Sequence, residues 1–171
     1  MQPSRSCRLA VASITSCLLV VIACRPGRSE TFRFGELGIS VPDGFTVERA
    51  AGPPLVERPV SLAFDEDGRL YVADSENNRI RRIDFTANTV TTVVGTGTAG
   101  YGGDNGPALM AMINSPRDIE IGPDGNLWIA DTGNHRVLRV DGAGVASVVI
   151  GDGSVSSAGE GSPARLFPVN A

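Results

Sequence analysis

One segment of this sequence occurs twice, and this repetition constrains the fold more than any other feature. Residues 59–84 read PVSLAFDEDGRLYVADSENNRIRRID, and residues 116–141 read PRDIEIGPDGNLWIADTGNHRVLRVD, at an offset of 57 positions without a gap. Ten of the 26 aligned positions are identical. Two copies of one multi-strand unit at a fixed period indicate a propeller or a related array of stacked sheets.

The second copy has the pattern of an antiparallel meander. Apolar and polar residues alternate over 118–121, as in a strand with one buried face. A Gly-Pro-Asp-Gly turn follows, and the apolar run 127–130 is typical of a short buried strand. After a second turn, a third strand is expected near 137–140. Strands joined by such short turns pair with their neighbours in the chain.

A fourth strand is predicted at the end of each copy. Residues 89–94 and 145–150 are rich in β-branched side chains, and a Gly-x-Gly sequence follows each of them. Four strands make one propeller blade. We therefore expect an all-β propeller segment of two four-stranded antiparallel blades plus a leading strand. The predicted segments are a leading strand and linker at 41–58, blade one at 59–97, a loop with one helical turn after Pro107 at 98–115, and blade two at 116–153.

The first 23 residues are typical of an export signal. Arg5 and Arg8 precede an apolar stretch at 9–23, which is shorter than the roughly 20 residues of a membrane-spanning helix. The sequence Val-Ile-Ala-Cys ending at Cys24 resembles a bacterial lipoprotein signal, in which Cys24 is lipidated and begins the mature chain. A secretory signal cut after Ala23 and a retained membrane anchor are the alternatives. We expect an exported cell-envelope protein with a lipid anchor and a tether at 24–40.

Charge and cysteine content exclude several functions. The net charge is −4, and loss of the leader would leave 13 basic against 19 acidic residues. An acidic chain lacks the basic surface that nucleic-acid binding requires. The other cysteines, Cys7 and Cys17, lie within the leader. The mature chain is therefore expected to have no internal disulfide, thiolate metal site or cysteine nucleophile.

The repeated unit resembles the NHL repeat. The matching cores are GRLYVADSENNRI at 68–80 and GNLWIADTGNHRV at 125–137, and GYGGDNGPA at 100–108 is similar to the long linker of bacterial members. The resemblance implies a β-propeller, often one that binds proteins, peptides or RNA. A minority of its relatives are enzymes, including lyases and sugar-lactone hydrolases.

The family commonly has six blades, whereas two are found here. A blade cannot bury both of its sheet faces alone, so we expect an incomplete ring with two apolar faces uncovered. Residues 154–171 would begin the connection to a missing third blade. On this reasoning the chain is a fragment, one part of a split gene, or a subunit that gains further blades from another chain or by self-association.

A second resemblance concerns residues 41–74, which are similar to the opening of sugar-dehydrogenase-like propellers in envelope proteins. Some of those proteins carry a c-type haem domain. The Cys-x-x-Cys-His sequence for haem attachment does not occur in this sequence. We expect no cofactor.

Two aspartates hold the same position in the two copies and are the first candidates for chemistry. Asp74 and Asp131 could be metal-binding or acid–base groups, or they could be structural, either capping turn N–H groups or pairing with Arg79 and Arg136. Their presence in both copies favours a structural role, because a catalytic group is usually needed once. We predict no catalytic, cofactor-binding or metal-binding residue. The structural repeat motif comprises Asp74, Asn77, Arg79, Asp131, Asn134 and Arg136.

Other polar and aromatic residues have mainly structural interpretations. Asn77, Asn78 and Asn134 suit left-handed turn positions, and His135, the single histidine, replaces Asn78 in the second copy. We expect Tyr71 and Trp128 in the core. Tyr101, among glycines, is either an exposed ligand contact or folds back on a blade. The glycine-rich run 95–103 lacks the lysine of a phosphate loop, so nucleotide binding is not expected.

These patterns favour a non-catalytic binding or scaffold module. Its ligand, a protein, peptide or carbohydrate, would meet the loops at the faces of the propeller. The alternatives are part of a propeller enzyme of the lactonase or sugar-dehydrogenase type, and a gene fragment without independent function.

Overall fold

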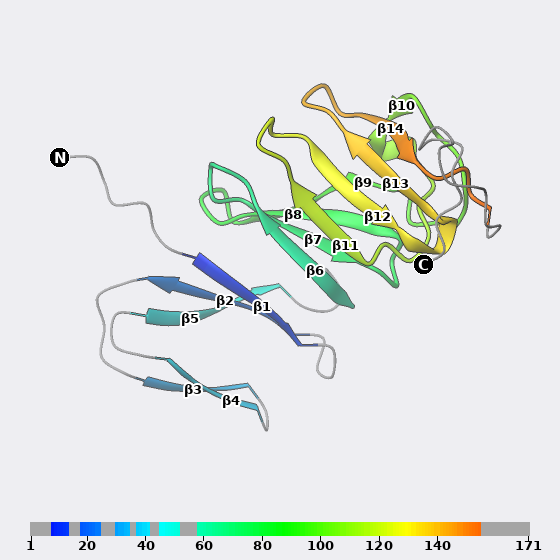
Figure 1. Cartoon of the computed structure of the whole chain (residues 1–171). Coiled ribbons are helices and arrows are strands. Elements are labelled where there is room, and N and C mark those ends of the chain that lie inside the picture. Colours follow the sequence, from blue (N-terminus) through cyan, green and yellow to red (C-terminus); the bar gives the residue numbers. More distant parts are fainter. Residues whose placement is uncertain are drawn as a thin grey trace.

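The structure is a computed structural model that describes residues 58–154 and the backbone of five earlier strands (Figure 1). The earlier strands are β1 (Arg8–Ser13), β2 (Leu18–Cys24), β3 (Glu30–Phe34), β4 (Leu37–Val41) and β5 (Phe45–Ala51). β1, β2 and β5 form one antiparallel sheet, and β3 and β4 form a hairpin.

These strands lie where the sequence predicted a leader, a tether and a leading strand. Removal of a leader, lipidation of Cys24 and the tethering role of 24–40 stay predictions, because the side chains there lie outside the described residues. The predicted connection to a third blade also lies outside them, apart from Ser154.

Blade one is the predicted four-stranded antiparallel sheet. It contains β6 (Pro59–Phe64), β7 (Leu70–Asp74), β8 (Arg79–Asp84) and β9 (Thr89–Val94), paired in sequence order. Asp65 holds the β6–β7 turn, since its carboxylate accepts hydrogen bonds from the backbone N–H groups of Asp67 and Arg69. Successive side chains of β7 then point to opposite faces of the sheet.

Blade two repeats this meander with one addition. Its strands are β11 (Asp118–Ile121), β12 (Leu127–Asp131), β13 (Arg136–Val140) and β14 (Val145–Ile150), and β10 (Gly106–Pro107) pairs with the outer edge of β14. Asn105 N–H donates to the carbonyl of Ala146 at 2.7 Å, and this bond ties the inter-blade loop to that edge. The sequence did not predict β10, because two residues carry no periodic signal.

Two single-turn 3₁₀ helices complete the described part of the chain. η1 (Ala108–Met110) begins directly after Pro107, as predicted, and η2 (Thr132–Asn134) forms the turn between β12 and β13. Among the described residues, no helix is long and apolar enough to cross a membrane.

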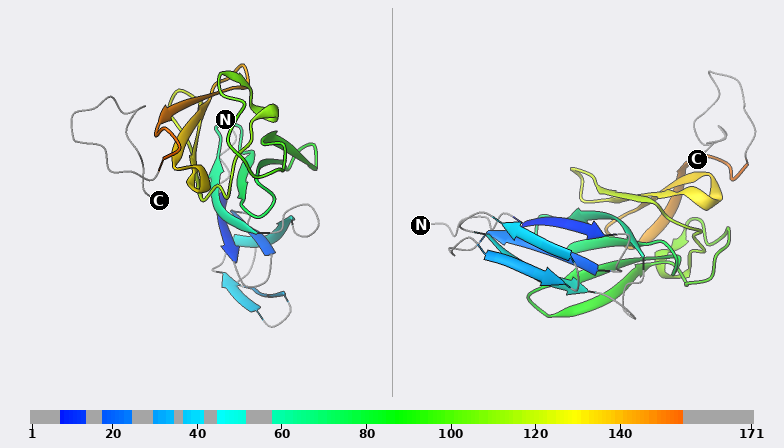
Figure 2. Two further views of the ribbon diagram at one scale, coloured as in Figure 1. Left: turned by 90° about the vertical axis from the view of Figure 1, so that its right-hand side faces the viewer. Right: turned by 90° about the horizontal axis from the view of Figure 1, so that it is seen from below.

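The two blades stand side by side through their first strands, β6 and β11 (Figures 1 and 2). Ser61 Oγ donates to Asp118 Oδ1 at 2.6 Å, and the N–H of Ile119 donates to Ser61 Oγ at 3.3 Å. Ser61 and Asp118 hold the same position in the two copies. Adjacent first strands and splayed outer strands are the arrangement of neighbouring propeller blades. Within the described residues the sheets do not close into a ring.

The main core lies between the blades. It draws Ala73, Ile80 and Val94 from blade one, Ile129 and Leu138 from blade two, and three residues of the loop between them: Ala108, Ala111 and Ile113. A second cluster, Leu70, Val72 and Ile83, is buried on the opposite face of blade one. The expectation of an uncovered apolar face was therefore wrong for blade one.

Blade two is buried on one face only. Residues of β12 and β13 alternate strictly between buried and partly exposed. Trp128, Ala130 and Val137 line the shallow, partly exposed face away from blade one. Tyr71 and Trp128 were both expected in the core, and both are only partly buried. Tyr71 packs against the main core, whereas Trp128 lies on the outward face of blade two.

Candidate functional site

The repeat motif of blade two is a buried ion-pair network. Asp131 ends β12, and its carboxylate is fully buried. Oδ2 accepts hydrogen bonds from Arg136 Nε at 2.7 Å and from Asn134 Nδ2 at 2.8 Å, and Oδ1 accepts one from the N–H of Asn114 at 2.7 Å. The carboxylate thus fixes both the β12–β13 turn and the chain that enters β11.

Arg136 extends this network into the inter-blade loop. Its side chain is fully buried, Nη1 pairs with Asp104 at 2.6 Å and Nη2 donates to the carbonyl of Met112 at 3.0 Å. Burial alone would lower the pKa of Arg136. The hydrogen bond and charge of Asp131, with the charge of Asp104, outweigh that effect and raise the pKa, so the guanidinium stays charged.

Tyr101 lies on this network and is nevertheless accessible. The guanidinium carbon of Arg136 is 4.0 Å from the centre of the Tyr101 ring, a cation–π geometry. Gly153 lies so close to the ring that an added Cβ would be 2.6 Å from Cε2. The ring therefore folds back on blade two, while 46% of the residue remains exposed. Tyr101 remains a candidate ligand contact, held in one orientation by its neighbours.

Blade one carries a related network with a different cation. Asp74 accepts hydrogen bonds from Asn77 Nδ2 and, at 3.2 Å, from Arg81 Nε. Arg79 instead donates through Nη2 to the carbonyl of Thr96 at 3.0 Å. The predicted pairing of Asp74 with Arg79 was wrong because blade one offers a second arginine, Arg81, where blade two has Leu138.

The turn residues differ in part from the prediction. Asn78 and His135 adopt positive φ values of 49° and 51°, as expected for a turn position. Asn77 and Asn134 are not in that region, and their amides bond to the neighbouring aspartates. Nδ1 of His135 is buried without a hydrogen-bond partner, and no described group of three or more His, Cys, Asp or Glu residues could hold a metal ion.

A polar cleft of about 600 Å³ opens where the two blades meet, at the end of the sheets that carries these networks. Two of its lining residues are joined, because Oδ1 of Asn78 accepts a hydrogen bond from the N–H of Ser115 at 2.9 Å. The lining residues are Arg58, Val60, Ser75, Glu76, Asn78, Ala99, Asn114, Ser115 and Arg117.

The sequence reasoning missed this cleft. Arg58 and Arg117 flank the two repeated prolines, Pro59 and Pro116, and so both lie at the entry to a first strand. An arginine at the entry to each first strand was the one feature of the sequence that could have indicated this cleft. Since one arginine precedes its proline and the other follows it, the repeat alignment did not pair them. Only the packing of the two blades brings them to one cleft.

Comparison with known families supports the repeat assignment. The NHL repeat model matches residues 114–139, and a domain of unknown function, DUF7133, matches residues 37–84. NHL repeat-containing protein 2 of Homo sapiens is 40% identical over 76 residues, which are 40% of this chain and 10% of that protein. Protein SUPPRESSOR OF QUENCHING 1, chloroplastic, of Arabidopsis thaliana is 32% identical over 87 residues, 51% of this chain and 8% of that protein. The chain thus spans a tenth or less of these relatives.

Solved structures support the fold. A Bacteroides thetaiotaomicron protein of unknown function superposes with a TM-score of 0.61 at 17% identity, over 88% of this chain and 37% of that one. An auxiliary nutrient binding protein from the same organism superposes with a TM-score of 0.55 at 13% identity, over 94% of this chain and 51% of that one. At such identities the likeness concerns the fold alone. With the family match, it shows that this chain carries an NHL repeat on propeller-type blades, which confirms the resemblance of residues 125–137. Residues 68–80 lie within the match to DUF7133.

Proposed function

We propose that this chain is part of an exported, lipid-anchored propeller that acts as a non-catalytic binding or scaffold module. The observation that carries the proposal is the use of the repeated aspartates. Asp74 and Asp131 are fully buried and hydrogen-bonded to the turns and arginines around them. Groups held in this way stabilise blades and are not accessible to a substrate.

The ligand would meet the end of the blades where the loops converge. Loops on a rigid sheet scaffold are the usual carriers of binding residues. Tyr101 supports this placement, because an exposed aromatic ring held on one side by Arg136 is a pre-ordered contact for a protein, peptide or carbohydrate.

Binding can be tested with the purified mature chain on peptide and carbohydrate arrays. We expect specific signals that survive EDTA and fall at least tenfold in Tyr101→Ala. Trp128→Ala, which removes an aromatic ring from the outward face of blade two, is the matched control and should keep the signals. Signals equal in parent and Tyr101→Ala would contradict the proposed contact. Turnover of a sugar lactone, or a metal-dependent rise in Tm, would favour an enzyme instead.

Export and anchoring need a separate experiment. The full chain, expressed in a bacterium, should lose residues 1–23 and fractionate with membranes. Mass spectrometry should find a lipid on Cys24, and Cys24→Ser should be soluble or unprocessed. A secreted, cleaved chain without lipid would contradict the anchor and leave export standing.

A further inference from the structure

We propose that the cleft between the blades binds a small-molecule oxyanion, a carboxylate or a phosphate group, between Arg117, Ser75 and Arg58. The inference rests on the proposed binding function and names the ligand chemistry of one site. The cleft volume, about 600 Å³, lies within the range of small-molecule sites.

Arg117 supplies an uncompensated positive charge. It is exposed, lines the cleft, and its guanidinium has no ion pair or hydrogen bond with any described residue. Other described arginines of the blades, such as Arg69, Arg81 and Arg136, form ion pairs with aspartates. A guanidinium offers a planar set of donors that fits the two oxygens of a carboxylate or phosphate.

Ser75 supplies a neutral donor beside this charge. It is 9% exposed, and its hydroxyl has no hydrogen-bond partner among the described residues although it lines the cleft. Its backbone N–H donates to the carbonyl of Arg58 at 3.2 Å, which fixes its position at the start of the β7–β8 turn. Since Oγ of Ser75 is not a fully buried atom, it is open to the cleft and can donate a hydrogen bond to an anion oxygen.

Arg58, the second arginine of the cleft, forms an ion pair with Glu76. Its Nη1 lies 2.7 Å from Glu76 Oε1, and both side chains are more than half exposed. An exposed ion pair is weak, so an incoming anion can share the arginine at little expense. The lining thus carries two arginines against one glutamate, a local positive charge on a chain of net charge −4. This charge would attract anions and reject cations.

The cleft is also pre-ordered. Asn78 of blade one accepts a hydrogen bond from the N–H of Ser115, and Asp131 of blade two accepts one from the N–H of Asn114, so this loop segment of the lining is fixed to both blades before a ligand arrives. Little ordering entropy would then oppose binding.

The test uses isothermal titration calorimetry on the mature chain at low salt, with citrate and inorganic phosphate as probes and glycerol as a neutral control. We expect saturable binding of at least one anion and none of glycerol, and the stronger probe distinguishes a carboxylate from a phosphate ligand. Arg117→Gln should weaken binding roughly tenfold or more, because it removes charge-assisted hydrogen bonds. Ser75→Ala should weaken it severalfold.

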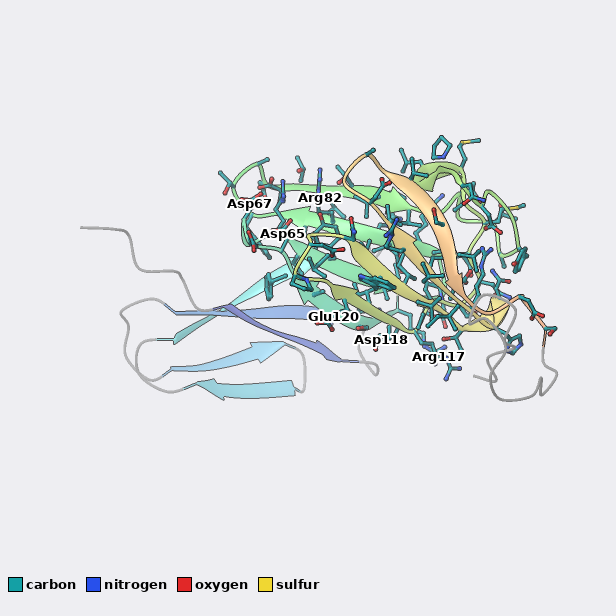
Figure 3. All side chains as sticks on the ribbon, turned by 45° about the horizontal axis from the view of Figure 1, so that its top comes forward. Asp65, Asp67, Arg82, Arg117, Asp118 and Glu120 are labelled. Atoms are coloured by element: carbon teal, nitrogen blue, oxygen red, sulfur yellow. The ribbon has the colours of Figure 1, made fainter. Side chains whose placement is uncertain are left out.

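Two further variants keep the result interpretable. Arg69→Gln changes the net charge equally and should bind like the parent. Arg69 pairs with Asp65 and Asp67, and Figure 3 shows these two aspartates at the opposite end of the blades from Arg117. Glu76→Gln frees Arg58 and should bind severalfold more tightly. Absence of saturable binding, or equal losses in Arg117→Gln and Arg69→Gln, would overturn the site. Loss of array signals in Tyr101→Ala with anion binding intact, or the reverse, separates this site from the broader binding function.

Discussion

Blade one and blade two have the same sequence pattern and different surroundings. In blade one, Leu70 and Val72 are buried on one face, while Ala73 joins the main core on the other. In blade two, Leu127 and Ile129 enter the main core, and Trp128 and Ala130 lie on a face that is partly exposed. The repeat therefore specifies a sheet with two apolar faces, and the position of each copy decides how much of each face is buried.

The polar networks differ in the same instructive way. In blade two one arginine, Arg136, joins Asp131, Asp104 and Tyr101. In blade one two arginines make the corresponding contacts: Arg79 bonds to the loop carbonyl of Thr96, and Arg81 pairs with Asp74. Concentrating three contacts on one buried cation should make blade two more sensitive to single substitutions.

The largest expected difference concerns the two equivalent arginines. Arg136→Leu leaves the fully buried carboxylate of Asp131 without its cation, and should lower the free energy of unfolding by about 3–5 kcal/mol. Arg79→Leu removes a charged hydrogen bond to Thr96 and should lower it by about 1.5–3 kcal/mol. Urea unfolding of both variants measures the gap, and equal losses would show that the two networks are energetically alike.

The equivalent aromatic residues sharpen the comparison of sheet faces. Tyr71→Ala opens a void beside the main core and should destabilise by about 2–3 kcal/mol. Trp128→Ala removes a larger side chain from the outward face of blade two and should cost about 1 kcal/mol. Thermal unfolding distinguishes the two, and a larger loss for Trp128 would mean that its face is covered in solution.

The contact between the first strands tests how strongly the blades are coupled. Ser61→Ala and Asp118→Ala should each cost about 1 kcal/mol, because each removes the 2.6 Å hydrogen bond. In a double-mutant cycle the coupling energy should be about 0.5–1.5 kcal/mol. Additive losses would indicate that this bond does not join the blades.

The smallest effect concerns acid sensitivity in the turn after β8. The backbone N–H groups of Ala87 and Thr86 donate to Asp84 and, despite slight desolvation, hold the pKa of its carboxyl below the ordinary value. The stabilisation is present above the unfolded-state pKa of about 3.9 and is lost as pH falls through the lower folded-state pKa. An NMR titration should show the lowered pKa, and Asp84→Asn should remove that part of the acid sensitivity. An unshifted midpoint for Asp84 would contradict the prediction.

Local patterns were sufficient to predict the blades. Period-two alternation, the Asp-Gly turns at 67–68 and 124–125, and the β-branched run of β9 each act over a few residues, and the predicted meanders are confirmed. The helical turn after Pro107 was predicted for the same reason.

Features that depend on distant contacts were missed. Asp74 pairs with Arg81 although Arg79 is its direct cross-strand neighbour, because the guanidinium of Arg79 bonds to the carbonyl of Thr96 instead. Tyr101 meets Arg136 only after the inter-blade loop folds back. The cleft is composite, since its arginines come from the entries to two different blades. These contacts depend on how distant segments pack together, and the local patterns of a single sequence do not predict that packing.

The main core has a consequence for how the described blades come apart. Because Ala73, Ile113 and Ile129 belong to one apolar cluster, neither blade can open along its inner face without exposing the interior of the other. The most protected amides, in β7 and β12, should therefore exchange with deuterium at one common rate, as a single cooperative unit. A partner that binds the inter-blade loop would then slow amide exchange in both sheets together.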